Sequence, residues 1–320
     1  MKVLVAVDGS FHSQKALEAL RSVKWAADTE IKLIATVRSA DVLPFGGNEH
    51  AHSMPEALQI TGKQMQAVVA QLAQATGLNV TSTVLQGDPK TLVVQEAKNS
   101  PADLIFMGSR GRKGVELILL GSVSQAVLMQ AQCPVVIVKS DPDQPAQPVQ
   151  FKKILVTVDN SPYSEAAMQW LKKLNWGDTQ FRLVTVVQPL PEVVSESEVS
   201  PLRISQLAGE QDKLIASARE SVQKWAAELG KAFGSTKVAS EIGQGDPREV
   251  ILRVAENWSA DLIVMGSHGR TGLNKLLLGS VSQAVAVQGF ASVAIVKGIV
   301  PKGQGGLKAT GMFTKIPDKK

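Results

Sequence analysis

The sequence contains an internal repeat, and this repeat limits the fold more than any other feature of the chain. Residues 108–127 and 266–285 share 14 identities in 20 positions, among them Gly-Ser-x-Gly and, nine residues later, Gly-Ser-Val-Ser. Identity of this extent is typical of one structural unit that is present twice. The length of 320 residues also suits two domains of average size. We therefore predict two domains of the same fold.

Each half alternates short apolar, β-branched segments with stretches of helical periodicity. The apolar segments fall at 2–7, 31–37, 79–85, 103–107 and 134–138, and again at 153–158, 181–187, 237–242, 261–265 and 292–296. Strands that alternate with helices form a parallel sheet that is covered on both faces. The predicted fold class is α/β, with two tandem Rossmann-like domains. Each domain is expected to hold a five-stranded parallel sheet of order 3-2-1-4-5.

A polar segment rich in proline separates the two halves. Residues 141–150 have no apolar periodicity, and we interpret them as a linker between a first domain, 1–140, and a second domain, 151–298. Residues 299–320 are rich in glycine and lysine, which predicts a disordered basic tail.

Charge and hydropathy argue against several classes of protein. The segment after Pro301 holds +4 of the net charge of +5, so the preceding residues are nearly neutral and predict no nucleic-acid partner. No apolar run reaches the about 18 to 20 residues that span a bilayer, and no signal region precedes the first strand. We expect a cytoplasmic protein with no membrane span. The single cysteine, Cys133, is interpreted as a small buried apolar residue.

The repeated glycine motif predicts a phosphate-binding loop. Gly121-Ser122 and Gly279-Ser280 precede helical stretches, so free main-chain amides and the positive end of the helix dipole would face an anion there. The serine hydroxyls of Ser122 and Ser280 can contact phosphate or a phosphate-bound Mg²⁺. The upstream glycines would keep side chains away from the ligand; they are Gly108, Gly111, Gly266 and Gly269. The alternative is a set of tight turns that need a positive φ.

Several other repeated residues have two interpretations. Arg112 and Arg270 would either neutralise phosphate charge or remain solvated. Asp8 and Asp159 follow the first strand of each half, where a carboxylate either caps the next helix or accepts hydrogen bonds from a base or ribose. The Gln-Gly-Asp-Pro segments at 86–89 and 244–247 are interpreted as structural, with Asp as the N-cap and Pro at the first helical position.

The longest connection in each half follows the second strand, at about 39–56 and about 188–203, and has the length of a lid or of a mobile loop. His50 and His52 lie in the first of these connections, but no third ligand stands at a recognisable spacing. We expect no metal to be held by protein ligands alone.

The strand end Val-Asp-x-Ser, the Gly-Asp-Pro segment and above all Gly-x2-Gly-x9-Gly-Ser resemble the ATP-binding branch of the universal stress protein (UspA-like) family in its tandem form. The resemblance covers nearly all of 1–140 and 151–298, and it implies the adenine nucleotide α-hydrolase-like variety of the Rossmann-like fold. It also implies residues for the adenine: Asp8, Val37, Asp159 and Val186. It implies residues for the ribose and α-phosphate: Met107, Gly108, Gly111, Met265, Gly266 and Gly269. It implies residues for the outer phosphates: Gly121, Ser122, Val123, Gly279, Ser280 and Val281.

Two departures from the family pattern are visible. Ala6 and Thr157 stand where some members have proline, and Arg110 corresponds to His268 across the repeat. The second departure predicts two sites of unequal affinity.

The leading hypothesis is an ATP-binding stress-response regulator, with Mg²⁺ bound through ATP and with little or slow hydrolysis. A Walker A Gly-Lys-Ser/Thr is absent, and no repeated His or Cys suggests a catalytic set. Autophosphorylation at Ser122, Ser124, Ser280 or Ser282 stays open. The alternatives are an adenylate-forming or ATP-hydrolysing enzyme of the same superfamily and a nucleotide-free interaction scaffold.

The fifth strands predict how the halves associate. Residues 135–138 and 293–296 are almost wholly apolar and would lie at a sheet edge, where exposed apolar strands promote aggregation. We expect the two edges to cover each other in an intramolecular pseudo-dimer. A homodimer of the whole chain and an unidentified protein partner are compatible with the sequence.

Overall fold

The computed structural model describes residues 1–39, 53–111, 120–141, 143, 145–190, 201–269 and 278–298, without the side chains of 201–204. The first half contains β1 (Lys2–Ala6), α1 (Phe11–Ser22), β2 (Glu30–Val37), α2 (Met54–Thr76), β3 (Asn79–Gln86), α3 (Pro89–Asn99), β4 (Leu104–Gly108), α4 (Ser122–Gln130) and β5 (Val135–Val138). The second half contains β6 (Lys153–Thr157), α5 (Pro162–Lys172), β7 (Gln180–Val187), α6 (Pro201–Phe233), β8 (Val238–Gln244), α7 (Pro247–Asn257), β9 (Leu262–Gly266), α8 (Ser280–Gln288) and β10 (Ser292–Val296).

The strand order in each half is the predicted 3-2-1-4-5. The order is β3-β2-β1-β4-β5 in the first half and β8-β7-β6-β9-β10 in the second, and all pairings inside a half are parallel. Each predicted strand begins and ends within two residues of its expected bounds. The α/β fold class is therefore confirmed.

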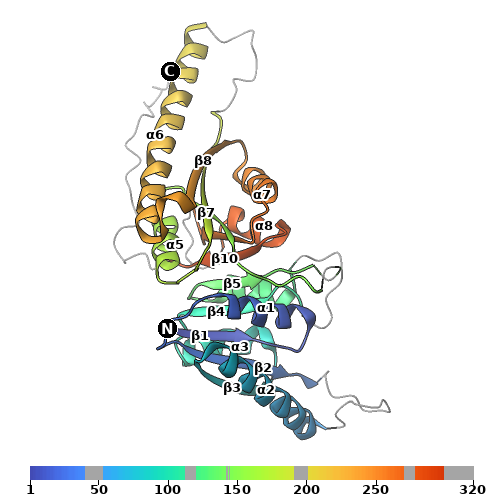
Figure 1. Ribbon diagram of the computed structural model, residues 1–320. Helices are drawn as coiled ribbons and strands as arrows, with labels where there is room; N and C mark the ends of the chain where they lie inside the picture. The colour runs from blue at the N-terminus through green and yellow to red at the C-terminus, as the bar shows by residue number, and fades with distance from the viewer. Residues whose placement is uncertain are drawn as a thin grey trace, which may run out of the picture.

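The two halves form one sheet of ten strands (Figure 1). Their fifth strands, β5 and β10, pair antiparallel in the middle, with Val293 opposite Ile137 and Ile295 opposite Val135. The expected covering of the two apolar edges by each other is confirmed, and the sheet is mixed at this single junction of the described strands.

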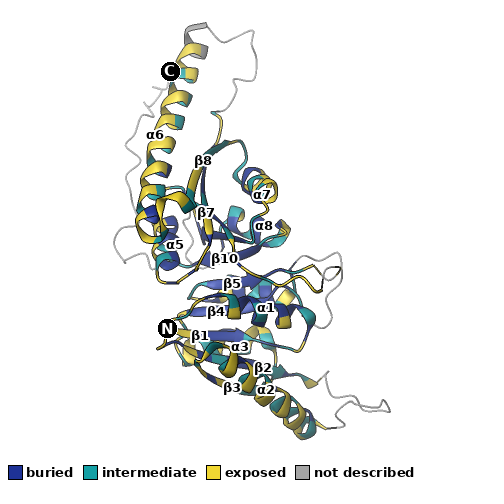
Figure 2. Ribbon diagram, in the orientation of Figure 1, coloured by how far each residue is buried: buried dark blue, intermediate teal, exposed yellow. Residues whose placement is uncertain are grey.

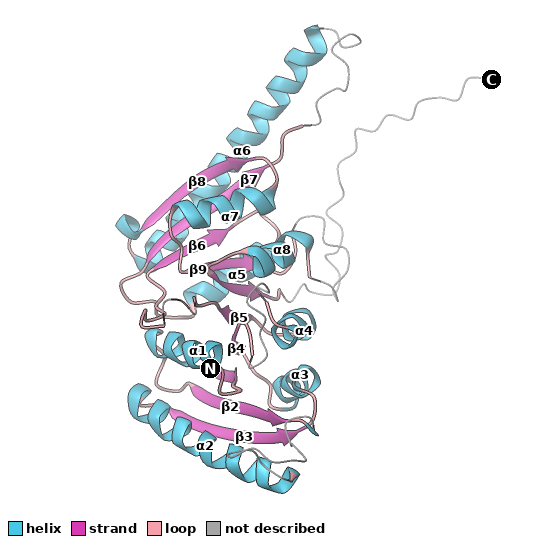
Figure 3. Cartoon of the chain, turned by 90° about the vertical axis from the view of Figure 1, so that its right-hand side faces the viewer, coloured by secondary structure: helices cyan, strands magenta, loops and turns pink. Residues whose placement is uncertain are grey.

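Helices cover both faces of this sheet and enclose two cores (Figure 3). One core lies under α1, α2, α5 and α6, and the other lies under α3, α4, α7 and α8. Both cores continue across the junction of the halves. On the first side, Phe106 of β4 contacts Phe151, which precedes β6, with ring centroids 6.4 Å apart. The central strands β4, β5, β9 and β10 are buried throughout, whereas the edge strands β3 and β8 are mostly half-buried or exposed (Figure 2).

Cys133 packs against the second core, and burial raises the pKa of its thiol to about 11. This agrees with an apolar role. No helix among the described residues is long and apolar enough to cross a membrane. The tail 299–320 and most of the two long connections, with His50 and His52, lie outside the described residues.

Candidate functional site

The carboxyl ends of β1 and β4, and of β6 and β9, are neighbours in the sheet, and the repeated motif follows them. Asp8 Oδ1 accepts a hydrogen bond of 3.0 Å from the amide of Ser10, and Asp159 Oδ1 accepts the same bond, also 3.0 Å, from Ser161. Each carboxylate thus shapes the turn that leads into α1 or α5. The capping itself is done by the serines, because Ser10 and Ser161 are the N-caps. Their hydroxyls accept from the amides three residues on.

The second carboxylate oxygen of each aspartate faces the glycine loop. A Cβ added to Gly111 would lie 2.7 Å from Asp8 Oδ2, and a Cβ on Gly269 would lie 3.0 Å from Asp159 Oδ2. These glycines therefore let the loop after β4 or β9 approach the aspartate. The bonds to Oδ1 agree with the structural interpretation of Asp8 and Asp159, and the ligand-binding interpretation stays a prediction.

Gly108 and Gly266 have a packing role that the sequence did not reveal. A Cβ on Gly108 would lie 2.5 Å from the carbonyl oxygen of His12, and a Cβ on Gly266 would lie 2.7 Å from the carbonyl carbon of Tyr163. Both glycines are buried, and they allow α1 and α5 to cross the strand at close range. Their side-chain-free surface faces a helix of the protein.

The loop closes at the start of the next helix. The amide of Gly121 donates to Ser109 O at 2.7 Å, and the amide of Gly279 donates to Ser267 O at 2.9 Å. These two N-cap amides are therefore used within the protein. Ser124 and Ser282 are buried, and their hydroxyls donate to Gly108 O and Gly266 O at 2.9 and 3.1 Å. These four bonds tie each helix start to the preceding strand.

The starts of α4 and α8 differ from most other helix starts of the protein. Their N-caps, Gly121 and Gly279, provide no side-chain cap, whereas α1, α2, α5 and α7 are capped by a serine or aspartate side chain. Ser122 and Ser280 are exposed at the first helical position. The next amides of these helices have no intrahelical partner, because the first turn of a helix leaves its N–H groups unpaired. An anion can be held there.

The remaining residues that were predicted for the site differ in burial, and some lie outside the described residues. Met107 and Met265 are buried in the core under α3, α4, α7 and α8. Val123 and Val281 are half-buried beside the serines. Arg112 and Arg270 lie outside the described residues. Asp88 and Asp246 are the N-caps of α3 and α7, and a proline follows each, as predicted. The Asp246 side chain accepts from the amide of Arg248 at 2.8 Å, whereas Asp88 makes no side-chain cap bond.

Val37 and Val186 are not equivalent positions. The amide of Gly87 donates to Val37 O, and the corresponding bond of Gly245 ends on Val187 O. Val187 is thus the counterpart of Val37. Because successive strand residues point to opposite faces, Val37 packs with Ala57 of α2 while Val186 lies against the opposite core. A count from the starts of β2 and β7 gives the same correspondence.

The two sites differ at three positions that contact one another. In the first half, His12 Nδ1 lies 3.0 Å from Ser140 Oγ, and burial together with the Arg110 guanidinium lowers the pKa of His12, against a smaller opposing effect of Asp8. In the second half, Tyr163 replaces His12, and its ring lies 4.9 Å from that of His268.

Gly298 replaces Ser140 in the second half, because a Cβ there would meet the Tyr163 ring at 3.0 Å. The sequence identified only the Arg110/His268 difference. The other two exchanges can be read from the repeat once His12 and Tyr163 are aligned.

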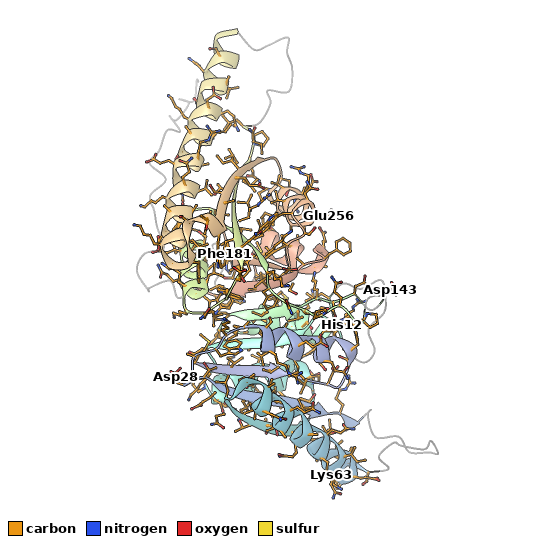
Figure 4. The ribbon with its side chains drawn as sticks, in the orientation of Figure 1. His12, Asp28, Lys63, Asp143, Phe181 and Glu256 are labelled. Atoms are coloured by element: carbon orange, nitrogen blue, oxygen red, sulfur yellow. The ribbon has the colours of Figure 1, made fainter. Side chains whose placement is uncertain are left out.

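A groove of about 950 Å³ lies between the halves, next to the first loop. Ser109, Arg110 and Lys139 line it from the first half, and the linker and α7 add the acidic residues Asp143 and Glu256 (Figure 4). Among the described residues, no group of three or more His, Cys, Asp or Glu side chains is arranged to hold a metal ion.

Comparison with known proteins agrees with this architecture. The sequence profile of the universal stress protein family matches residues 1–139 and 150–297. The chain belongs to the universal stress protein family. A universal stress protein of Mycobacterium tuberculosis is 30% identical over 289 residues, covering 88% of this chain and 92% of the relative. One from Methanocaldococcus jannaschii is 35% identical over 141 residues, or 43% of this chain and 81% of the relative.

The fold is also that of a solved family member. The crystal structure of a universal stress protein from Archaeoglobus fulgidus matches with a TM-score of 0.59 and 24% identity, covering 92% of this chain and 96% of the other. The match to the Mycobacterium tuberculosis relative thus extends over both halves of this chain and nearly the whole length of that relative, whereas the Methanocaldococcus jannaschii relative matches less than half of this chain.

Proposed function

We propose that each half of this universal stress protein binds one ATP with Mg²⁺, and that nucleotide occupancy changes how the protein contacts a protein partner. The observation that carries this proposal is the repeated helix start without a side-chain cap at Gly121-Ser122 and Gly279-Ser280. A glycine N-cap, an exposed hydroxyl and the positive end of a helix dipole suit a polyphosphate in both halves.

The residues also suit the other parts of the ligand. Asp8 and Asp159 each place Oδ2 beside the glycine loop, at the edge of the sheet where the ribose or base would lie. Ser122 and Ser280 are exposed and would contact an outer phosphate or its Mg²⁺. Ser124 and Ser282 are buried donors to main-chain carbonyls, so we assign them to the support of the loop and not to autophosphorylation.

The proposal is one of binding with little or slow hydrolysis, and it is tested by stoichiometry. Ser122→Glu and Ser280→Glu each place a carboxylate where phosphate is expected. An acidic residue in the first turn stabilises the helix by about 0.3 to 1 kcal/mol, so loss of binding would not come from unfolding. In calorimetric titrations with MgATP, wild type is expected to bind two nucleotides, each variant one, and the double variant none.

Thr91→Glu is the matched control, because Thr91 is exposed in the first turn of α3 and lies outside the two glycine loops. It adds the same charge and is expected to leave the stoichiometry at two. Wild-type protein that binds no MgATP, or glutamate variants that bind as wild type, would contradict the proposal.

A further inference from the structure

The side chains of two lysines contact the half of the protein to which they do not belong. Lys139 follows β5 and Lys297 follows β10, and the strand registers make them equivalent, since Val138 and Val296 both pair with the glycine that ends the neighbouring strand. Lys139 is buried and Lys297 half-buried. Neither residue was singled out by the sequence, because a lysine after a strand is usually a solvated surface residue.

Each lysine contacts the carboxyl end of a helix in the opposite half. Lys139 Nζ donates to the carbonyl oxygen of Gly289, the C-cap residue of α8. Lys297 Nζ donates at 3.4 Å to the carbonyl oxygen of Met129, in the last turn of α4. A cation at the carboxyl end of a helix interacts favourably with its dipole. The helices involved are the two whose amino ends carry the repeated motif.

These contacts complete a closed path of hydrogen bonds through both halves. In the first half, the amide of Gly121 donates to Ser109 O, and the amide of Ser109 donates to Val138 O at 2.8 Å, one residue before Lys139. From Lys139 the path reaches α8. There the amide of Gly279 donates to Ser267 O, and the amide of Ser267 donates to Val296 O at 2.9 Å, one residue before Lys297.

Burial of these ammonium groups is unfavourable by itself. Burial, and to a smaller extent the charge of Arg110, lowers the pKa of Lys139 to about 8, and burial also lowers the pKa of Lys297. A pKa below the usual value means that the folded protein disfavours the charged amine. A methionine of similar length would avoid this penalty but would lose the contact to the opposite helix.

We propose that Lys139 and Lys297 are positioning residues of the nucleotide sites, each fixing the phosphate-binding helix of the opposite half. The inference rests on the proposed function. Each lysine directly follows the strand that is hydrogen-bonded to the loop of its own half, and its Nζ contacts the helix of the other half. Occupancy of the site in one half is therefore transmitted through its lysine to the helix of the other half, which couples the two sites.

The test uses proteins that keep one site each. Ser122→Glu leaves only the site at α8, and Ser280→Glu leaves only the site at α4. Lys139→Met in the first background is expected to weaken MgATP binding about fivefold, because the helix of the remaining site loses the contact that fixes it. The same substitution in the second background is expected to leave binding unchanged. Lys297→Met should give the opposite pattern, so that each lysine variant is the control for the other.

A general loss of packing would not make each lysine variant weaken only the site of the opposite half. Thermal unfolding of every variant checks that it is folded, and Lys139→Gln replaces Lys139→Met if the latter does not fold. Lysine variants that weaken the site of their own half, or neither site, would overturn this inference alone. Two bound nucleotides in both glutamate parents, or none in wild type, would overturn the proposed function and this inference with it.

Discussion

The glycines of the repeated motif are packed against other main-chain or side-chain atoms of the protein. Gly108 faces His12, Gly111 faces Asp8, and a Cβ on Gly121 would lie 3.2 Å from Ser109 O. The sequence interpretation assigned the same residues to a ligand. Both roles fit one position, because a loop that must lie close to its own fold also leaves no side chain over the ligand. A substitution at such a glycine therefore tests the fold before it tests binding.

Gly108→Ala is expected to destabilise the protein by about 1 to 3 kcal/mol, because its methyl group would overlap the main chain of α1 and force α1 or β4 to shift. The measurement is urea unfolding without nucleotide. Gly62→Ala is the matched control in the same half. No atom lies within 4 Å of its Cβ, and it sits inside α2, so it should stabilise by about 0.5 to 1 kcal/mol. A neutral Gly108→Ala would show that the glycine serves only a ligand.

At the scale of elements, the strands were predictable and much of the site was not. Runs such as Val135–Val138 are local signals, and each predicted strand was found within two residues. The reasons for the glycines are not local, since they depend on which helix crosses which strand. The cross-half contact of Lys139 with Gly289 joins residues 150 positions apart, and nothing in the neighbouring sequence indicates it.

The turn between β6 and α5 has a left-handed residue, as does the corresponding turn of the first half, but the residue type differs. Asn160 has φ 61° and corresponds to Gly9, which has φ 74°. In the second half the asparagine adds contacts to α6. Its Oδ1 accepts from Trp225 Nε1 at 3.2 Å and from the hydroxyl of Ser221. Asparagine tolerates a left-handed conformation better than other side chains do, and here it also holds the long helix to the turn.

Two substitutions at Asn160 separate these effects. Asn160→Gly keeps the backbone conformation and loses the contacts to α6, so it should destabilise by about 0.5 to 1 kcal/mol. Asn160→Ala adds left-handed strain and should destabilise by about 1 to 2 kcal/mol more. Thermal unfolding followed by tryptophan fluorescence measures both. Gly9→Ala is the control, because it adds the strain without removing a side-chain contact. Equal losses for Asn160→Gly and Asn160→Ala would argue against strain.

For the whole molecule, the central fact is that one sheet and two cores extend through both halves. β5 and β10 pair directly, Phe106 contacts Phe151, and Lys15 Nζ donates to Gln147 O of the linker at 3.0 Å. A bridge between Lys24 and Asn175 joins the halves at a further point. Separate domains joined by a linker would be expected to unfold independently. These shared contacts instead predict that the halves unfold as one cooperative unit.

The five tryptophans make this testable, since four of them lie in the second half. Leu20 in α1 and its counterpart Leu171 in α5 are both fully buried, so truncation of either to alanine should destabilise by about 3 kcal/mol. In a Trp25→Phe background, fluorescence during urea unfolding reports only on the second half. Leu20→Ala is expected to lower the midpoint of that transition as much as Leu171→Ala does. The destabilisation in the first half reaches the second through β5 and β10, because neither half can keep its apolar fifth strand covered once the other has unfolded. A midpoint that moves with Leu171→Ala and stays in place with Leu20→Ala would mean that the halves unfold separately.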